Sequence, residues 1–221
     1  MLKPVRNHSW DLEPRDAIAL QTELAGQLVF APPPAEIELV AGVDVSMRRG
    51  VARAAVVVMT MPELHEQERV CADAPIAYPY VPGLLTFREA PTILQALERL
   101  EHLPDLLMFD GQGYAHPRRM GLASHIGVLL DHPTVGCAKS RLCGTYKEPP
   151  RERGAYTHLY DGDEVIGAVV RTRTGVKPVF VSAGHRMTLD AAIELVLACG
   201  KGYRLPEPTR WAHRAAAQTG A

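Results

Sequence analysis

The sequence predicts an α/β protein built on one mixed sheet, in which three antiparallel strands come first and parallel strands flanked by helices follow. Three segments with strand character lie close together at 37–46, 51–61 and 68–77, joined by short links as in an antiparallel meander. Farther along, 105–110 and 133–138 are short apolar strands with a helical pattern between them, which predicts parallel pairing. No internal repeat, low-complexity segment or linker interrupts the 221 residues, so we expect a single domain over 1–221.

The first helix is predicted at 14–29, where small and apolar residues recur at helical spacing and the prolines at 32–34 end it. The β-branched residues of 37–46 predict a strand. The sequence MRRG then predicts a turn that leads into the second strand at 51–61, and the third strand lies within 68–77.

The middle of the chain alternates helix and strand. The spacing predicts a helix over 82–103, with Pro91 kinking or restarting it. The run at 105–110 is apolar throughout up to its final aspartate, as expected for a strand buried on both faces. A second helix is predicted over 117–130, because Pro117 suits the first helical position.

The C-terminal part predicts additional hairpins and helices. Two hairpins are expected to turn at DGDE (161–164) and RTGV (173–176). The next helix is capped by Thr188 and ended by Gly200.

A last helix is predicted to start after Pro208, and residues from about 215 to 221 are expected to form a disordered tail. Among common folds, this order of strands and helices resembles the ribonuclease-H-like fold.

Composition gives a weaker indication of function. The net charge of −1 neither favours nor excludes a nucleic-acid partner, but residues 116–153 contain seven Lys or Arg and only three acidic residues. None of the four cysteines forms a C-x-x-C pair, so a zinc site is not expected. No apolar run is long enough to span a bilayer and the N-terminus lacks a signal-peptide core, so a cytoplasmic protein without membrane contact is expected.

Two aspartates stand out because they lie within or directly after predicted strands. Asp44 is flanked by valines, and Asp110 ends the apolar run at 105–110. If these strands are neighbours, the two carboxylates lie side by side and need a cation, for which oxygen ligands favour Mg²⁺ or Mn²⁺. Glu89 is the candidate third carboxylate, and such a group suits phosphoryl transfer. The alternatives are that each aspartate only caps a strand end and that Glu89 is a solvated helix residue.

The turn after Asp110 combines glycines with cations. Gly111 and Gly113 allow the backbone to approach a ligand, but the full G-x-G-x-x-G spacing of a dinucleotide site is absent because position 116 is histidine. His116, Arg118 and Arg119 are expected to hold phosphates if a metal site lies beside them. Otherwise, the glycines form only a tight turn and the cations lie on the surface.

Six stretches together make a specific resemblance, because they occur in one order and cover nearly the whole chain. They are VAGVDVS at 40–46, PYVPGLLTFRE at 79–89, FDGQGYAHPRRMGLASHIG at 109–127, PTVGCAKSRLCG at 133–144, SAGH at 182–185 and RLPEPTRWAH at 204–213. In these stretches the sequence resembles the endonuclease V family of deoxyinosine 3′ endonucleases. The resemblance implies a ribonuclease-H-like fold, in agreement with the predicted strand order.

The resemblance also implies roles for single residues. Asp44, Asp110 and Glu89 match the metal-binding carboxylates of the family. Lys139 matches a catalytic lysine just past a strand, where a cation stabilises charge on the phosphate or leaving oxygen. His213 matches a catalytic position near the metal that is His or Asp among members.

A second set of positions matches the part of the family that binds the damaged base. Pro79, Tyr80, Val81 and Pro82 match a wedge: two prolines fix an extended segment, and Tyr80 offers a ring that stacks on bases when one base is flipped out of the duplex. The alternative is a polyproline turn with Tyr80 packed on the core. The remaining matches are a phosphate contact at His116 and a base pocket formed by Gly83, Leu85, Gly111, Gly121 and Leu122.

The function implied is a Mg²⁺-dependent endonuclease, with Mn²⁺ as a substitute. It recognises deoxyinosine in DNA by base flipping, cleaves the second phosphodiester bond 3′ to the lesion, and leaves 3′-hydroxyl and 5′-phosphate ends, which starts the repair of deaminated adenine. A monomer is expected. The alternative enzyme is an inosine-specific ribonuclease with the same active site, and the alternative from another class is a module that marks lesions without cutting them.

Overall fold

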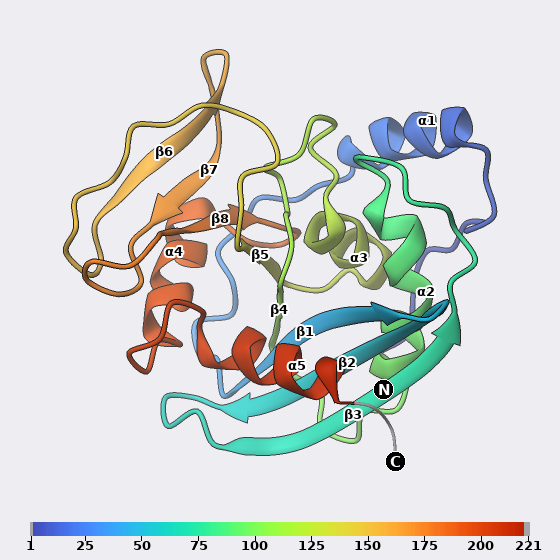
Figure 1. Cartoon of the computed structure of the whole chain (residues 1–221), viewed down its shortest axis with the longest axis horizontal. Coiled ribbons are helices and arrows are strands. Elements are labelled where there is room, and N and C mark those ends of the chain that lie inside the picture. Colours follow the sequence, from blue (N-terminus) through green and yellow to red (C-terminus); the bar gives the residue numbers. More distant parts are fainter. Residues whose placement is uncertain (1, 219–221) are drawn as a thin grey trace.

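The computed structural model describes residues 2–218, and in this part of the chain eight strands form one sheet in the order β3-β2-β1-β4-β5-β8-β7-β6 (Figure 1). The strands are β1 (Leu39–Arg48), β2 (Val51–Thr60), β3 (Glu66–Pro75), β4 (Leu106–Phe109), β5 (Thr134–Ala138), β6 (Tyr156–Asp161), β7 (Glu164–Val170) and β8 (Val179–Ala183). The helices are α1 (Pro14–Ala25), α2 (Leu85–Leu97), α3 (Leu122–Leu130), α4 (Leu189–Ala198) and α5 (Glu207–Ala217).

The sheet is mixed, as predicted. β1, β2 and β3 pair antiparallel, β1, β4 and β5 pair parallel, and β5, β8, β7 and β6 pair antiparallel. The predicted meander, the parallel strands after it and both C-terminal hairpins are therefore confirmed. This is a ribonuclease-H-like arrangement with additional hairpins and helices at its C-terminal end.

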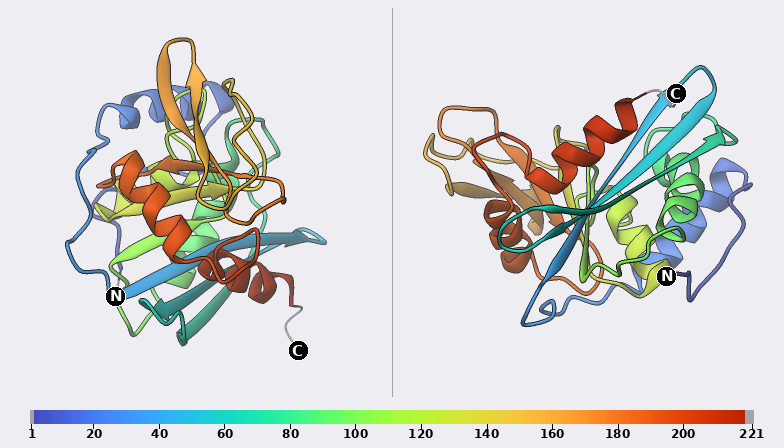
Figure 2. Two further views of the ribbon diagram at one scale, coloured as in Figure 1. Left: turned by 90° about the vertical axis from the view of Figure 1, so that its left-hand side faces the viewer. Right: turned by 90° about the horizontal axis from the view of Figure 1, so that it is seen from below.

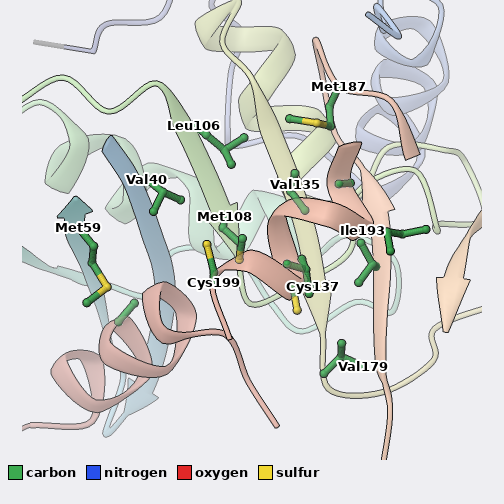
Figure 3. Packing of buried hydrophobic residues seen from close by; sticks show 14 of the residues in the cluster. Val40, Met59, Leu106, Met108, Val135, Cys137, Val179, Met187, Ile193 and Cys199 are labelled. Carbon is green, nitrogen blue, oxygen red and sulfur yellow. The ribbon is translucent and has the colours of Figure 1, made fainter. Parts of the chain in front are cut away.

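Helices cover both faces of the sheet, with α2 on one side and α5 on the other (Figure 2). The alternation of side chains along a strand divides the core into two layers. Ala41 and Val43 pack with α2 and α3, whereas Val40, Leu106 and Met108 pack with α4 and α5 (Figure 3). Every residue of β4 and β5 is buried, which explains why their sequences are wholly apolar or small.

The helix predicted over 117–130 begins later than expected, because α3 starts only at Leu122. Arg119 has a φ of 59°, in the left-handed region, and its N–H donates to the His116 carbonyl in a turn. Gly121 then precedes the helix in extended backbone, where a Cβ would lie 2.4 Å from the Gln112 carbonyl oxygen. Pro117 therefore belongs to a turn, and the close approach at Gly121 sets the start of the helix.

Two other helix predictions need smaller corrections. The expected restart at Pro91 is wrong, because α2 runs through Pro91 as one helix, and it ends at Leu97 rather than at 103. α1 ends at Ala25 rather than at 29, in a turn at Gly26.

At the C-terminal end, the Thr188 cap is confirmed, since its hydroxyl accepts a hydrogen bond from the Ala191 N–H. The tail predicted from about 215 is wrong for residues 215–217, which belong to α5 and include the buried Ala215 and Ala216. The rest of that prediction, from 219 on, lies outside the described residues. Within residues 2–218, no helix has the length and apolar character that crossing a membrane requires.

Candidate active site and base-sized cavity

Asp44 and Asp110 lie side by side on neighbouring parallel strands. β1 and β4 are in register at Val43 and Phe109, and the Asp110 N–H donates to the Val43 carbonyl at 3.0 Å. An aspartate follows directly after each of these paired residues, so the two carboxylates lie next to each other at the same edge of the sheet. The adjacency expected from the sequence follows directly from this parallel pairing.

Helix α5 brings a third group to the pair. His213 Nδ1 lies 2.6 Å from Asp44 Oδ2, and ligand atoms of Asp44, Asp110 and His213 all lie within 4.8 Å of one another. Lys139 follows β5, and its ammonium forms an ion pair with the Asp110 carboxylate while lying 3.3 Å from His213 Nδ1. The shorter contact, to Asp44, indicates that the Nδ1 proton is donated to that carboxylate.

The backbone of β1 allows α5 to approach this closely. A Cβ added at Gly42 would lie 2.0 Å from the carbonyl carbon and oxygen of Pro208, so a larger residue would push the helix away. Within α5, the carboxylate of Glu207 accepts a hydrogen bond at 2.9 Å from Trp211 Nε1. These contacts fix the first turns of the helix that carries His213.

The position of Lys139 is also fixed from the backbone. The guanidinium of Arg204 donates to the carbonyl oxygens of Lys139, at 2.5 Å, and Pro178, at 2.9 Å. The segment after β5 is thereby held against the segment before α5, so Lys139 lies in a fixed position beside Asp110 and His213.

Glu89 lies near this group but not within it. It is half-buried on α2, and burial together with the charges of Asp44 and Asp110 raises its pKa to about 8 against the opposing charge of Arg88. The influence of both aspartates on its pKa shows that Glu89 stands near them, although its oxygens are not among the ligand atoms that cluster within 4.8 Å.

The donor set fits a divalent cation that prefers oxygen ligands. Burial raises the pKa of Asp44 and the neighbouring Asp110 raises it further, whereas the hydrogen bond from His213 lowers it. Asp110 Oδ2 is buried and makes no hydrogen bond apart from the ion pair with Lys139. Two close carboxylates and an imidazole are typical of a metal site, and the clustered acids are compatible with one.

The raised pKa of Glu89 predicts a pH-dependent stability. Because the folded-state pKa of about 8 exceeds the unfolded value of 4.5, the folded protein binds the proton more tightly, so the contribution of Glu89 to the free energy of unfolding decreases as pH rises from about 4.5 to 8. We expect this contribution to fall by about 2–4 kcal/mol over the window in protein treated with EDTA, while buried histidines such as His116, whose pKa is lowered to about 4, contribute a gain below pH 6.5. Thermal unfolding at pH 5, 6, 7 and 8 measures it.

Glu89→Gln is the matched variant for that measurement, since it keeps the shape of the side chain without the charge. We expect the difference in free energy of unfolding between the wild type and Glu89→Gln to shrink by this amount from pH 5 to pH 8, while the contributions of the histidines and of Asp44 stay common to both proteins. The same pH dependence in both proteins would show that Glu89 is not ionising in this window.

A cavity of about 340 Å³ opens beside the acidic group, and Asp110 and Lys139 belong to its wall. Its other lining residues come from the segment before α2 and the first turn of that helix, the turn after β4, the start of α3, and the end of β5 with the segment after it. They are Tyr80, Val81, Pro82, Gly83, Leu85, Thr86, Gly111, Gln112, His116, Gly121, Leu122, Ala138, Ser140, Arg141 and Leu142. All the predicted base-pocket and wedge residues therefore line one cavity, except Pro79, which is exposed next to it.

The wedge segment, residues 79–82, exposes the ring of Tyr80 and is held in place by hydrogen bonds to the glycine that follows it. Tyr80 is 72% exposed, so the alternative that packs it on the core is wrong. Three residues later, Gly83 has a φ of 79° and its carbonyl accepts hydrogen bonds from His116 Nε2, at 3.0 Å, and Arg118, at 2.7 Å. The turn after β4 thus holds the base of the wedge segment while Tyr80 projects from it.

Hydrogen bonds and ion pairs within the protein already engage His116 and Arg119, two of the residues expected to hold phosphates. His116 Nδ1 accepts from the Arg118 N–H, so both ring nitrogens are bonded within the protein, and burial lowers the pKa of His116 to about 4. Arg119 pairs with Glu164 at 2.6 Å and Asp161 at 2.9 Å. His116 is therefore neutral at pH 7, and its predicted phosphate contact stays a prediction.

Comparisons with known proteins identify the arrangement. The sequence model of one protein family, Endonuclease V, matches residues 22–214. The endonuclease V of the archaeon Methanothrix thermoacetophila is 52% identical over 206 residues, which are 93% of this chain and 92% of the relative. This chain belongs to the endonuclease V family. Membership makes it a nuclease, as the acidic group beside the cavity suggests.

Solved endonuclease V structures share the whole architecture. That from Streptomyces avermitilis is 43% identical, with a TM-score of 0.90 over 97% of this chain and 96% of that one. Endonuclease V of Ciona intestinalis, solved with a 24mer DNA containing an inosine followed by a ribo-adenosine, is 27% identical, with a TM-score of 0.79 over 91% of this chain and 95% of that one.

Several residues of this endonuclease V cavity were not predicted as site residues. They are Thr86, Gln112, Ala138, Ser140, Arg141 and Leu142. Gln112 Nε2 donates to the Ser140 carbonyl at 2.9 Å and so joins two walls of the cavity. Ser140, Arg141 and Leu142 directly follow Lys139 within the stretch PTVGCAKSRLCG, and this position next to a predicted catalytic residue is the signal that could have found them.

Proposed function

We propose that this chain is a metal-dependent endonuclease that recognises deoxyinosine in DNA and cleaves the second phosphodiester bond 3′ to the lesion. The observation that carries the proposal is the contact between an acidic group and a base-sized cavity: they share Asp110, and Lys139 of the cavity wall pairs with it. The position of the cut, the 3′-hydroxyl and 5′-phosphate ends, and a role in repairing deaminated adenine rest on the family resemblance.

The cavity suits a flipped purine. Its volume of about 340 Å³ is at the small end of ligand sites, and glycines at 83, 111 and 121 expose backbone groups in its wall. Hypoxanthine differs from adenine in its carbonyl at position 6 and its protonated N1. Backbone N–H and C=O groups therefore discriminate between the two bases by opposite hydrogen-bonding patterns along that edge.

The site would hold Mg²⁺, or Mn²⁺ in its place, between Asp44 and Asp110, with His213 and Glu89 completing the surroundings. When bound, the cation neutralises charge on the phosphate and lowers the pKa of a water. Lys139 then keeps a positive charge beside the reacting phosphate, where it stabilises the departing oxygen. His213 orients the Asp44 carboxylate through its Nδ1–H.

Tyr80 is proposed to fill the gap that a flipped base leaves in the duplex. We expect Tyr80→Ala to weaken binding to inosine-containing DNA by about tenfold, because stacking on an aromatic ring is worth about 1–3 kcal/mol per base. The rate of cleavage at saturating DNA should change less. Fluorescence anisotropy and single-turnover kinetics give the two numbers, with Tyr80→Phe as the matched control that keeps the ring. Equal affinity of the Ala variant and the wild type would refute the wedge.

The proposed activity is tested with labelled duplexes that carry one deoxyinosine, or adenine at the same place, in the presence of Mg²⁺ or EDTA. We expect cutting directly after the 3′ neighbour of the deoxyinosine, at the second phosphodiester bond, only with deoxyinosine and only with the metal. Binding without cutting under every metal condition would contradict the proposal and support the module that marks lesions.

A second candidate is an inosine-specific ribonuclease with the same residues. It is favoured by the Ciona intestinalis relative, whose bound DNA has a ribonucleotide directly after the inosine. An inosine-containing RNA strand assayed alongside the duplexes decides between the two. Cutting of RNA without cutting of DNA would keep the active site and change the substrate.

A further inference from the structure

A second groove, rich in arginine, lies at the C-terminal end of β1, where the strand turns into β2. Ser46, Arg48, Arg49 and Arg53 of the β1–β2 hairpin line it, and the last turn of α5 closes its other side through Ala216 and Ala217. Its volume is about 400 Å³. We call it the arginine groove; it shares no residue with the cavity beside Asp110.

The arginine groove lies on the same face of the sheet as the acidic group. Side chains alternate along a strand, so Asp44, Ser46 and Arg48 point to one side of β1. Arg53 on β2 is the partner of Ser46 in the antiparallel register and therefore points to that side as well.

Helix α5 runs along β1 from the active site to the arginine groove. Its middle carries His213, which contacts Asp44, and its end lies beside the tip of the β1–β2 hairpin (Figure 2, right). Four residues separate Asp44 from Arg48, which is about 13 Å along a strand. Successive phosphates of one B-form strand advance about 3.4 Å along the helix axis, so this length corresponds to about four nucleotides.

Of the arginines in the arginine groove, one is neutralised by a carboxylate of its lining and two are not, within the described part of the chain. Arg53 pairs with Asp73 at 2.7 Å, but within residues 2–218 the exposed guanidinium groups of Arg48 and Arg49 have no hydrogen-bond or carboxylate partner. By contrast, Arg119 near the cavity is held by carboxylates. Arg49 takes a φ of 50° beside Gly50 at 81°, a tight turn that presents both arginines at the tip.

We propose that the arginine groove binds the backbone of the substrate strand, through one phosphate within about five nucleotides of the cut. The proposal rests on the function proposed above, since it assumes a nucleic-acid strand whose scissile phosphate lies at Asp44 and Asp110. A bidentate guanidinium contact is the geometry that phosphate oxygens favour. Such a contact adds affinity and register without reading the sequence.

The test combines a charge-removing variant with a charge-removing substrate. Arg48→Gln is compared with the wild type on inosine-containing DNA in which single phosphates are replaced, one position at a time, by uncharged methylphosphonates. We expect one position within about five nucleotides of the cut to weaken binding to the wild type by about tenfold. Arg48→Gln should show about the same loss on unmodified DNA and no further loss at that position.

Two further readouts separate a phosphate contact from a structural effect. The slope of log affinity against log salt concentration should decrease by about one in Arg48→Gln, while kcat at saturating DNA stays the same. Arg173→Gln is the matched control, because Arg173 is exposed on the connection between β7 and β8 and lines neither the cavity nor the arginine groove. It should keep the wild-type slope.

The outcomes are distinct. If the wild type cuts inosine-containing DNA but Arg48→Gln keeps its salt slope, or if every methylphosphonate weakens the variant as much as the wild type, the arginine groove is not a phosphate site. If the wild type neither binds nor cuts the inosine-containing strand, the proposed function fails and the inference fails with it.

Discussion

Asp110→Asn is expected to reduce cleavage of inosine-containing DNA by about 10³-fold or more, because it removes one of the two carboxylates that would hold the cation. Binding of the lesion should persist and even tighten. The Asp110 carboxylate lies in the wall of the cavity beside the reacting phosphate, so its loss lowers the repulsion between like charges and leaves Lys139 free to pair with the phosphate. Single-turnover cleavage and equilibrium binding in EDTA measure the two effects separately.

The same strand offers a matched control. Asp105 lies directly before β4, at its other end, where its carboxylate accepts hydrogen bonds from the N–H groups of Glu38 and Leu39 at 2.9 and 3.0 Å. Asp105→Asn should therefore lower stability by about 1 kcal/mol and leave cleavage per folded molecule unchanged. An active Asp110→Asn enzyme would refute the metal assignment, whatever the control does.

The two aspartates could be singled out from local sequence, because each lies within or at the end of a segment that the sequence predicts to be a strand. A strand, a helix and a second strand imply parallel pairing of β4 with β5, and β-branched residues around Asp44 mark a further strand, whose place beside β4 was only a possibility until the structure showed it. Given that β1 and β4 are neighbours, the register of Val43 with Phe109 brings the two carboxylates together.

The approach of His213 could not be derived in this way. It comes from a helix 169 residues farther along the chain, and its place depends on the close packing of α5 over Gly42. No periodicity reports such a contact, so only the family resemblance pointed to this residue. The turn at 116–120 was missed for a similar reason, since Gly121 is required by the Gln112 carbonyl rather than by a local preference for a turn.

Gly42→Ala is expected to damage both stability and activity, although it adds a single methyl group far from solvent. That methyl would lie 2.0 Å from the Pro208 carbonyl and 2.7 Å from the Thr209 nitrogen, and neither is a side chain that can rotate away. The backbone of α5 must move instead, at a cost of about 3 kcal/mol, which for a chain of this length lowers Tm by about 10 °C.

The loss of activity in Gly42→Ala should exceed the loss of folded protein, because α5 carries His213 against Asp44 at 2.6 Å. A displacement of about 1 Å in a catalytic group commonly reduces the rate by about 100-fold. Cleavage measured well below Tm isolates this effect, with Gly26→Ala as the control, since a methyl there meets its nearest atom, the Glu23 carbonyl oxygen, at an ordinary 3.4 Å. Wild-type Tm and wild-type cleavage in Gly42→Ala would mean that α5 does not pack on β1 in solution. His213 would then have no fixed place in the active site, and the cation would depend on the carboxylates alone.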